Sequence, residues 1–260
     1  MSIDQHVARD RLIAHAGGEV EGIRYTNSLD ALLNSSNYFD LIEVDVVLGR
    51  DGPLIAHDGL EKNYLLDRKF SSVTTSEFSS AKYLNRFKTT SLCELCTSQA
   101  FSDVRFVLDI KGDTEEYRQT LDAVIASIAG LQWEDRIILQ FYCIEDLRYA
   151  MNLGCKYFIA TLWKNFHEPF GPLAKKFITD AFSEAQEKIV GISLHMKHLK
   201  RVEFDLNHTG IAFLLGYDRT IYLHGHDEQS DSLRAVRKGF GLYSHKPVQL
   251  SSGGLPSCLI

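Results

Sequence analysis

The chain has 260 residues, of which 45% are apolar and 24% are charged, as in an ordinary globular protein with a sizeable core. Its formal net charge of −6 and its lack of Lys and Arg clusters argue against a nucleic-acid-binding surface. No stretch approaches the run of about eighteen apolar residues that spans a bilayer, no signal-peptide pattern opens the chain, and the five scattered cysteines fit free thiols, so we expect a cytoplasmic protein with no transmembrane segment.

Apolar, β-branched runs alternate with amphipathic helical runs, which is the pattern of an α/β protein with a parallel sheet. Strands are predicted near 11–15, 41–47, 105–111, 136–142, 156–160, 189–193, 220–224 and 240–244. Helices are predicted at 28–34, 115–129, 144–152, 173–188 and 230–238, while 211–215 fits either a strand or a helix. Eight strands are enough to close a barrel, and we expect a single domain over residues 1–260.

The interval between the second and third predicted strands, roughly 51–103, is too long for an ordinary βα loop of about 2–6 residues. We interpret it as an insertion after strand 2, and it contains His57. In a parallel barrel the segments after the strands form the active face, so residues at strand ends are candidates for function. Those at or near such ends are His15, Glu43, Asp45, Asp109, Lys111, Gln140, His195 and His224.

Two of the predicted strands carry charged residues inside apolar runs, where charge is seldom placed unless something binds it. Glu43 and Asp45 are two positions apart, so their side chains share one face of the strand and can grip one cation. Asp109 and Lys111 repeat this spacing, which adds a third carboxylate and a fixed positive charge. Three carboxylates and no thiolate suit a hard divalent ion such as Mg²⁺ or Ca²⁺ better than zinc.

A hard cation with vacant positions beside a lysine is a receptor for a phosphoryl group. The two histidines His15 and His57 then fit a general base and a general acid on opposite sides of phosphorus. Structural interpretations remain open for each motif. The carboxylates of Glu43 and Asp45 could form ion pairs with Lys or Arg on an edge strand, and His15 could be a core histidine. Lys111 could simply pair with Asp109.

Two further polar residues are interpreted as structural. Asn27 precedes an apolar helical run and is predicted to be the N-cap of the helix at 28–34. Asp113 is predicted to cap the helix at 115–129 in the same way.

The first quarter of the chain resembles the glycerophosphodiester phosphodiesterase family in the order and spacing of five motifs. These are His15-Ala-Gly-Gly18, Thr26-Asn27-Ser28, Glu43-Val44-Asp45, Asp51-Gly52 and His57-Asp58. The resemblance resumes at 90–94 and 108–111 and is faint from 136 onward. It implies a (β/α)8 TIM barrel, a metal site formed by Glu43, Asp45 and Asp109, and an acid-base pair formed by His15 and His57.

The implied reaction cleaves a glycerophosphodiester, or a similar small hydroxyl-bearing phosphodiester of lipid metabolism, to a phosphomonoester and an alcohol. The implied cofactor is one divalent cation, Mg²⁺ or Ca²⁺, with Mn²⁺ as an alternative. In this family a hydroxyl next to the phosphate can attack first and form a cyclic phosphate that water later opens. His15 is assigned as the base and His57 as the acid, although the two roles could be exchanged.

The chain departs from the family pattern at two positions. The family usually has Arg after the first histidine and Glu as the third metal ligand, whereas this chain has Ala16 and Asp109. We expect Lys111 to bind the phosphate instead, with further substrate-binding candidates at Arg24, His195, His224 and His226. The Asp-x-Lys pair and the missing Arg are also similar to the venom sphingomyelinase D family. A lyase that forms a cyclic phosphate is therefore one alternative, and a non-catalytic phosphate-binding barrel is another. The sequence leaves the oligomeric state open.

Overall fold

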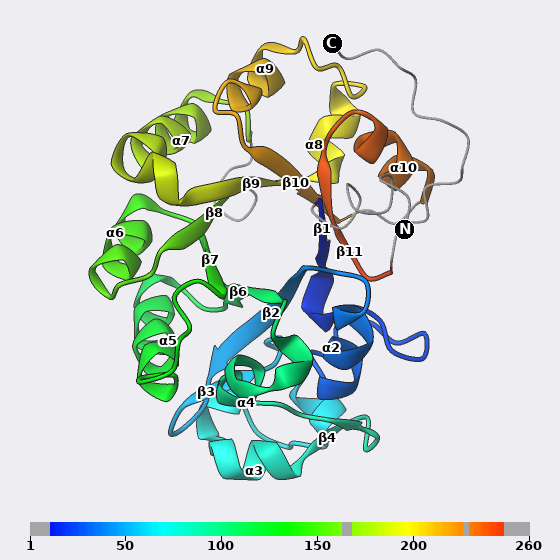
Figure 1. Ribbon diagram of the computed structural model, residues 1–260, viewed down its shortest axis with the longest axis vertical. Coiled ribbons are helices and arrows are strands. Elements are labelled where there is room, and N and C mark those ends of the chain that lie inside the picture. Colours follow the sequence, from blue (N-terminus) through cyan, green and yellow to red (C-terminus); the bar gives the residue numbers. More distant parts are fainter. Residues whose placement is uncertain (1–10, 163–167, 226–228, 247–260) are drawn as a thin grey trace.

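The computed structural model describes residues 11–162, 168–225 and 229–246. Eight parallel strands form a closed sheet in the order β1-β2-β6-β7-β8-β9-β10-β11, because β1 pairs with both β2 and β11. Figure 1 shows these strands at the centre of the molecule and helices around the outside. The strands are β1 (Leu12–Ala14), β2 (Leu41–Leu48), β6 (Arg105–Ile110), β7 (Ile137–Phe141), β8 (Tyr157–Thr161), β9 (Ile189–His195), β10 (Thr220–His224) and β11 (Gly241–Ser244).

Helices connect the successive strands of the barrel, so the chain is a (β/α)8 TIM barrel and the predicted fold class is confirmed. The connecting helices are α2 (Leu29–Ser36), α5 (Thr114–Ser127), α6 (Ile144–Asn152), α7 (Pro172–Ala185), α8 (Met196–Arg201), α9 (Thr209–Leu215) and α10 (Gln229–Arg237). The longest of them have 14 residues, and none in the described part of the chain is long and apolar enough to cross a membrane.

All eight predicted strands are present, with ends within two residues of the predicted ones. The segment 211–215, which fitted either type of element, lies in helix α9, where Gly210, Ile211 and Leu214 are buried on one side. Asp113 caps α5 as predicted: its side chain accepts hydrogen bonds from the N–H groups of Glu115 and Glu116.

The insertion after strand β2 is also present and contains its own secondary structure. It comprises β3 (Pro53–Ile55), α3 (Thr75–Ser80), the two-stranded β4 (Lys82–Tyr83) and β5 (Phe87–Lys88), and α4 (Leu92–Thr97). Its aromatic side chains form a small core in which the ring of Tyr64 contacts those of Phe70, Phe78 and Tyr83. The Tyr64 hydroxyl donates to the backbone oxygen of Thr26, which ties the insertion to the loop that precedes α2.

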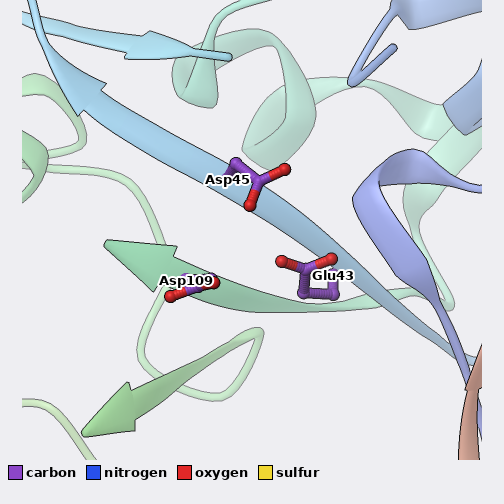
Figure 2. A group of neighbouring side chains, drawn as sticks. All are labelled: Glu43, Asp45 and Asp109. Carbon is purple, nitrogen blue, oxygen red and sulfur yellow. The ribbon is translucent and has the colours of Figure 1, made fainter. Parts of the chain in front are cut away.

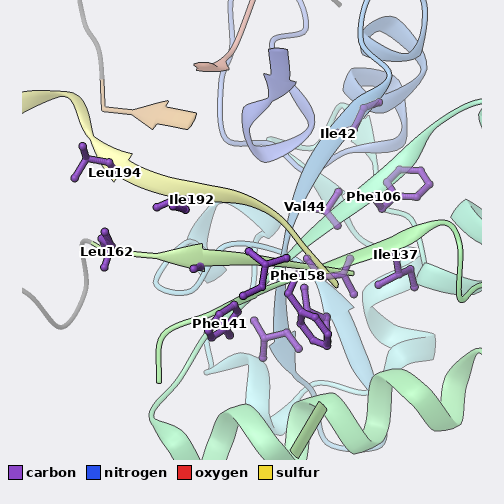
Figure 3. Packing of buried hydrophobic residues seen from close by; sticks show 14 of the residues in the cluster. Ile42, Val44, Phe106, Ile137, Phe141, Phe158, Leu162, Ile192 and Leu194 are labelled. Atoms are coloured by element: carbon purple, nitrogen blue, oxygen red, sulfur yellow. The ribbon is translucent and has the colours of Figure 1, made fainter. Parts of the chain in front are cut away.

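The core of the barrel has two layers because side chains alternate between the two faces of each strand. The larger layer lies between the sheet and the helices and includes the residues labelled in Figure 3, such as Val44, Phe106 and Phe141. The smaller layer fills the barrel interior with Ile13, Val107, Ile138, Ile159, Tyr222 and Tyr243. Asp109 shares the inward face of β6 with Val107, so alternation directs a carboxylate into the barrel.

Candidate functional site

Three carboxylates meet on the inner face of the barrel, on the neighbouring strands β2 and β6. Asp45 and Asp109 are paired in register, and Glu43 lies two residues before Asp45 on the same face of β2. One oxygen from each of the three residues lies within 4.8 Å of the others, and all three side chains are buried. Figure 2 shows the carboxylates directed toward a common space. The structure thus brings together the three residues that the sequence suggested as metal ligands.

Lys111 is the cation that faces this trio of acids. Its Nζ lies 2.6 Å from Asp45 Oδ1 and 2.5 Å from Asp109 Oδ2, and its side chain is only 16% exposed. Burial acts to lower the pKa of Lys111, but the charges of Asp45, Asp109 and Glu43 raise it well above its usual value. Lys111 is therefore a fixed positive charge, and it forms the ion pair with Asp109 that the structural interpretation of this residue expected, together with a second pair with Asp45.

One ammonium does not balance three carboxylates. Burial, together with the charges of Asp45 and Asp109, raises the pKa of Glu43 well above its usual value, although Lys111 opposes the change. Burial alone would also raise the pKa of Asp45, but Lys111 and His57 outweigh it and the pKa of Asp45 is lowered. A divalent cation would supply the missing positive charge, and three carboxylates with no thiolate are the donors that Mg²⁺ and Ca²⁺ prefer. The residues thus fit such an ion.

Each carboxylate of the trio is oriented by a hydrogen bond from another element. The backbone N–H of Ala16 donates to Glu43 Oε2 at 2.5 Å, and the Tyr142 hydroxyl donates to Asp109 Oδ1. The Asn27 amide donates to Asp45 Oδ2 at 2.8 Å, while its oxygen accepts from the N–H of Asp45 at 3.0 Å. Such outer contacts hold metal ligands in a set direction.

This role corrects the prediction that Asn27 is a helix cap. The N-cap of α2 is Ser28, whose side chain accepts a hydrogen bond from the N–H of Ala31. Asn27 adopts a left-handed backbone conformation with φ of 48°, which turns its side chain toward β2 and away from the helix.

His15 and His57 reach the centre of β2 from opposite directions. His15 follows β1, which runs parallel to β2 and pairs with residues 41–42. His57 follows β3, which runs antiparallel to β2 and pairs with residues 46–48. Both segments pair with the edge of β2 opposite to the edge that pairs with β6. Both histidines line one cavity with Glu43 and Asp109. The structure therefore brings together the two histidines that the sequence singled out.

Aromatic rings surround His15 at the mouth of this cavity. His245 stacks on His15 with ring centroids 4.8 Å apart, and Tyr25 contacts His15 edge-on at 5.2 Å. Tyr25 also makes an edge contact with His57 at 6.3 Å and is 41% exposed. Tyr243 contacts His15 from the barrel interior at 5.9 Å. Contact with these rings restricts the orientation of the imidazole.

The cavity has a volume of about 260 Å³ and lies at the carboxyl ends of the strands. Its lining combines residues singled out from the sequence with others that the sequence analysis missed. It consists of His15, Tyr25, Glu43, His57, Asp109, Lys111, Gln140, Ser193, His195, His224, Gly225 and Tyr243. The missed residues are Tyr25, Ser193, Gly225 and Tyr243. Ser193 and Tyr243 were detectable in principle, because both lie in predicted strands that end at the active face.

The substrate-binding candidates differ in where the structure places them. His195 and His224 line the cavity as neighbours, in register on β9 and β10. Arg24 does not line it: the side chain is half exposed and forms an ion pair with Glu19 at 3.3 Å. His226 lies outside the described residues. The cationic candidate that the structure brings to the cavity is therefore Lys111, not Arg24.

No model of a protein family matches the sequence, and a search of curated protein sequences found no relative. Solved structures are more informative. A protein from Agrobacterium tumefaciens, described as a glycerophosphoryl diester phosphodiesterase, aligns with a TM-score of 0.72 over 91% of this chain and 94% of its own, at 16% identity.

Two further structures give the same result. A phosphodiesterase from Oleispira antarctica, solved in complex with the product sn-glycerol-3-phosphate, has a TM-score of 0.67 at 15% identity and covers 94% of this chain and 96% of its own. A glycerophosphodiester phosphodiesterase from Thermotoga maritima has a TM-score of 0.65 at 17% identity and covers 92% of this chain and 95% of its own. The chain is thus a TIM barrel with the fold of solved glycerophosphodiester phosphodiesterases.

Proposed function

We propose that the chain is a metal-dependent phosphodiesterase of the glycerophosphodiester phosphodiesterase family, with one catalytic domain over residues 1–260. The observation that carries this proposal is the meeting of three buried carboxylates, one lysine and two histidines at a single cavity. A shared fold alone does not define an activity, because one barrel supports many reactions. Here the arrangement of charged and ionisable groups matches what the cleavage of a phosphodiester requires.

Glu43, Asp45 and Asp109 would hold one divalent cation, Mg²⁺ or Ca²⁺, with Mn²⁺ as an alternative. When bound, such an ion neutralises charge on the non-bridging oxygens of the phosphate. Lys111 adds a second positive charge at the same place, since its ammonium already lies between Asp45 and Asp109. It binds the phosphate in place of the arginine that the family usually has after the first histidine. The side chain at that position, Ala16, is fully buried and carries no charge.

The two histidines supply proton transfer. His15 removes the proton from the hydroxyl that attacks phosphorus, and His57 donates a proton to the oxygen of the departing alcohol. Their approach from opposite ends of β2 supports placement on two sides of a phosphate bound at the trio. In the first step the attacking hydroxyl belongs to the substrate, and a cyclic phosphate forms. In the second step water attacks with the roles exchanged: His57 takes the proton of the water and His15 returns its proton to the departing ring oxygen, which yields a phosphomonoester.

The cavity favours a small polar substrate. Its volume of about 260 Å³ is just below the range of about 300–1,000 Å³ that is common for ligand pockets. The Oleispira antarctica phosphodiesterase, solved with sn-glycerol-3-phosphate, has the same fold. We therefore expect a deacylated glycerophosphodiester, or a similar hydroxyl-bearing diester, as the substrate.

The proposal is tested by turnover of a panel of glycerophosphodiesters with Mg²⁺, Ca²⁺ or Mn²⁺, and with EDTA as the metal-free control. His15→Ala and His57→Ala are each expected to lower kcat by about 10²–10⁴-fold, because each removes one proton carrier. Both variants should still bind glycerol 3-phosphate in a calorimeter. His208→Asn is the matched control: the His208 ring nitrogen Nδ1 caps α9 outside the cavity, and the Asn side-chain oxygen can accept the same hydrogen bond.

The products distinguish the alternatives. Reaction in water labelled with ¹⁸O should place the label in the phosphomonoester. A cyclic phosphate that accumulates without the label would indicate a lyase of the sphingomyelinase D type. Metal-dependent binding of diesters with no turnover of any of them would contradict the proposal and indicate a non-catalytic phosphate-binding barrel.

A further inference from the structure

The wall of the cavity opposite the carboxylate trio is built by β9 and β10. In the closed order of eight strands, β9 is four positions from β2, and β10 is four positions from β6. His195 and His224 end these two strands and are paired in register, so they stand at the same height on the far wall. Their rings contact edge-on with centroids 4.9 Å apart. A phosphodiester held at the trio would extend one of its two arms toward this pair.

The structure assigns the tautomer of His195. The backbone N–H of Lys197 donates to His195 Nδ1 at 3.1 Å, in the position of an N-cap for α8. An imidazole nitrogen that accepts a hydrogen bond must carry a lone pair, so in this arrangement the ring proton is on Nε2. His195 therefore carries its hydrogen-bond donor on Nε2.

Gly225 leaves room for this edge of the ring. A Cβ atom at position 225 would lie 2.5 Å from His195 Nε2 and 2.6 Å from Cε1, which is closer than real contacts allow. Gly225 lines the cavity beside His195. The Nε2 edge of the imidazole thus lies at the cavity wall, in a place that only glycine leaves open.

Two buried hydroxyl groups continue the same wall. Ser193 lies two residues before His195 on β9, and Tyr243 is on β11, next to β10. Both line the cavity and are at most 3% exposed. The two hydroxyls interact with each other, since a hydrogen bond with Ser193 acts to lower the pKa of Tyr243, but among the described residues neither oxygen has a further partner. Each hydroxyl can make more hydrogen bonds than the one they share, so this wall is suited to a ligand that carries oxygen atoms.

We propose that His195 recognises, through its Nε2–H, a hydroxyl group on the glyceryl arm of the substrate, the arm that stays bonded to phosphorus, with Ser193 and Tyr243 completing a polyol subsite. This subsite rests on the proposed phosphodiesterase function and sharpens it. It selects a glyceryl arm by the hydroxyl farthest from phosphorus, while the hydroxyl next to the phosphate remains available for attack. A site built to hydrogen-bond a hydroxyl discriminates strongly against an analogue that lacks it.

The test compares two chromogenic diesters that differ by one hydroxyl: glyceryl 4-nitrophenyl phosphate and 2-hydroxypropyl 4-nitrophenyl phosphate. Both keep the hydroxyl next to the phosphate and the same leaving group. The measured quantity is the ratio of kcat/KM for the glyceryl diester to that for the hydroxypropyl diester. We expect a ratio of about 10 or more for the wild-type protein, since one buried hydrogen bond is worth about one decade.

Two substitutions separate the nitrogens of the His195 ring. His195→Asn keeps an acceptor near the Nδ1 position, which still caps α8, but lacks the Nε2 donor; its ratio is expected to fall to about 1–2. His195→Gln places an amide N–H near the Nε2 position and loses the cap; it should keep most of the ratio while its Tm falls. The proposal would be overturned if His195→Asn kept the wild-type ratio of kcat/KM. It would also be overturned if the ratio fell in the variant with the lower Tm, His195→Gln, and not in His195→Asn.

Gly225→Ala provides an independent test, because the added Cβ displaces the His195 ring. Its ratio is expected to fall like that of His195→Asn. Gly130→Ala is the matched control: Gly130 also has a positive φ, of 83°, but a Cβ there meets nothing within 4 Å. Equal ratios in the two alanine variants would contradict the subsite. If the wild-type protein cleaves neither diester nor any other in the panel, the proposed function itself fails.

Discussion

Asn27 illustrates how one side chain links backbone conformation to the carboxylate trio. Its φ of 48° lies in the left-handed region, which asparagine tolerates better than most residues other than glycine. From this conformation its amide satisfies both the backbone N–H and a carboxylate oxygen of Asp45, on a strand 18 residues away in sequence. Nothing in the local pattern distinguishes this role from helix capping, because Asn is a good N-cap and a helix does follow.

Asn27→Ala is expected to weaken binding of the divalent ion by about 10–100-fold, as loss of an outer-shell partner does in other metal sites. It should also lower the free energy of unfolding by about 1–3 kcal/mol, since the buried N–H of Asp45 loses its acceptor. Calorimetric titration with Mg²⁺ or Ca²⁺ and urea unfolding in EDTA measure the two effects.

Asn27→Gly separates backbone strain from the lost hydrogen bonds, because glycine adopts a positive φ without cost. If Asn27 orients Asp45, the glycine variant should bind the ion as poorly as the alanine variant. Binding at the wild-type level in Asn27→Gly would mean that only the backbone conformation matters.

The residues of the site were predictable to different degrees. Glu43, Asp45, Asp109 and Lys111 stood out because each is charged within an apolar strand. Tyr25 and Tyr243 did not stand out, since an aromatic residue in or near a strand more often packs in the core. This holds even though Tyr243 lies in a predicted strand that ends at the active face. Their place beside His15 depends on how β1, β11 and the following loops lie in space, and no local pattern encodes that arrangement.

The insertion behaves as an element with its own small core, on which the position of His57 depends. Val47 and Leu54, paired across β2 and β3, belong to the same cluster as the aromatic rings of α3 and the β4–β5 pair. The segment that carries His57 is thus supported from one side by β2 and from the other by this cluster. Packing defects in the insertion should therefore reach the site, whereas equal defects elsewhere should not.

Phe78→Leu tests this dependence. Phe78 lies on α3 in the insertion core and is 2% exposed, so the substitution should lower the free energy of unfolding by about 1–2 kcal/mol. We also expect kcat to fall several-fold, because His57 loses part of its support. Phe182→Leu is the matched control, at a side chain 4% exposed on α7 in the barrel core. It should destabilise the protein similarly with little change in kcat. An equal loss of kcat in both variants would contradict the link.

Secondary structure was the most predictable level of this molecule. Parallel strands buried on both faces have mostly apolar sequences, and the eight strands of this barrel are largely buried and mostly apolar. The segment 211–215 was ambiguous because five apolar residues fit a strand as well as a helix. In the structure this segment is helical, and His208 is the N-cap of α9: its ring accepts a hydrogen bond from the N–H of Gly210.

At the scale of the whole molecule, the unbalanced charge of the trio couples folding to protons and to the ion. The pKa of Glu43 is raised in the folded state, mainly by burial and by Asp45. Between the usual pKa and this raised value, the folded protein binds a proton that the unfolded chain does not bind. Without metal, the free energy of unfolding should therefore fall as pH rises through that window. Urea unfolding in EDTA at a series of pH values measures this slope.

Binding of the divalent ion should release the proton from Glu43, because only the ionised carboxylate is a ligand. Affinity for the ion is thus expected to rise with pH in the same window. Calorimetry in two buffers with different enthalpies of ionisation counts the protons released. Glu43→Gln should abolish both the release and the Glu43 contribution to the slope, whereas Glu187→Gln, at an exposed position, should leave both unchanged. A release that persists in Glu43→Gln would identify a different group.

Two short strands pair with the same edge of β2: β1 with residues 41–42 at its start and β3 with residues 46–48 at its end. The registers of these two pairings along β2 therefore determine the separation of His15 and His57. A shift of β3 along β2 by two residues would change that separation by about 7 Å, which is the rise of two residues in a strand. The turn at Gly49–Pro53 is closed by a 2.8 Å hydrogen bond from Gly49 N–H to the oxygen of Gly52. By fixing the register of β2 and β3, this turn sets the distance between the two histidines proposed for proton transfer, although it contributes no side chain to the cavity.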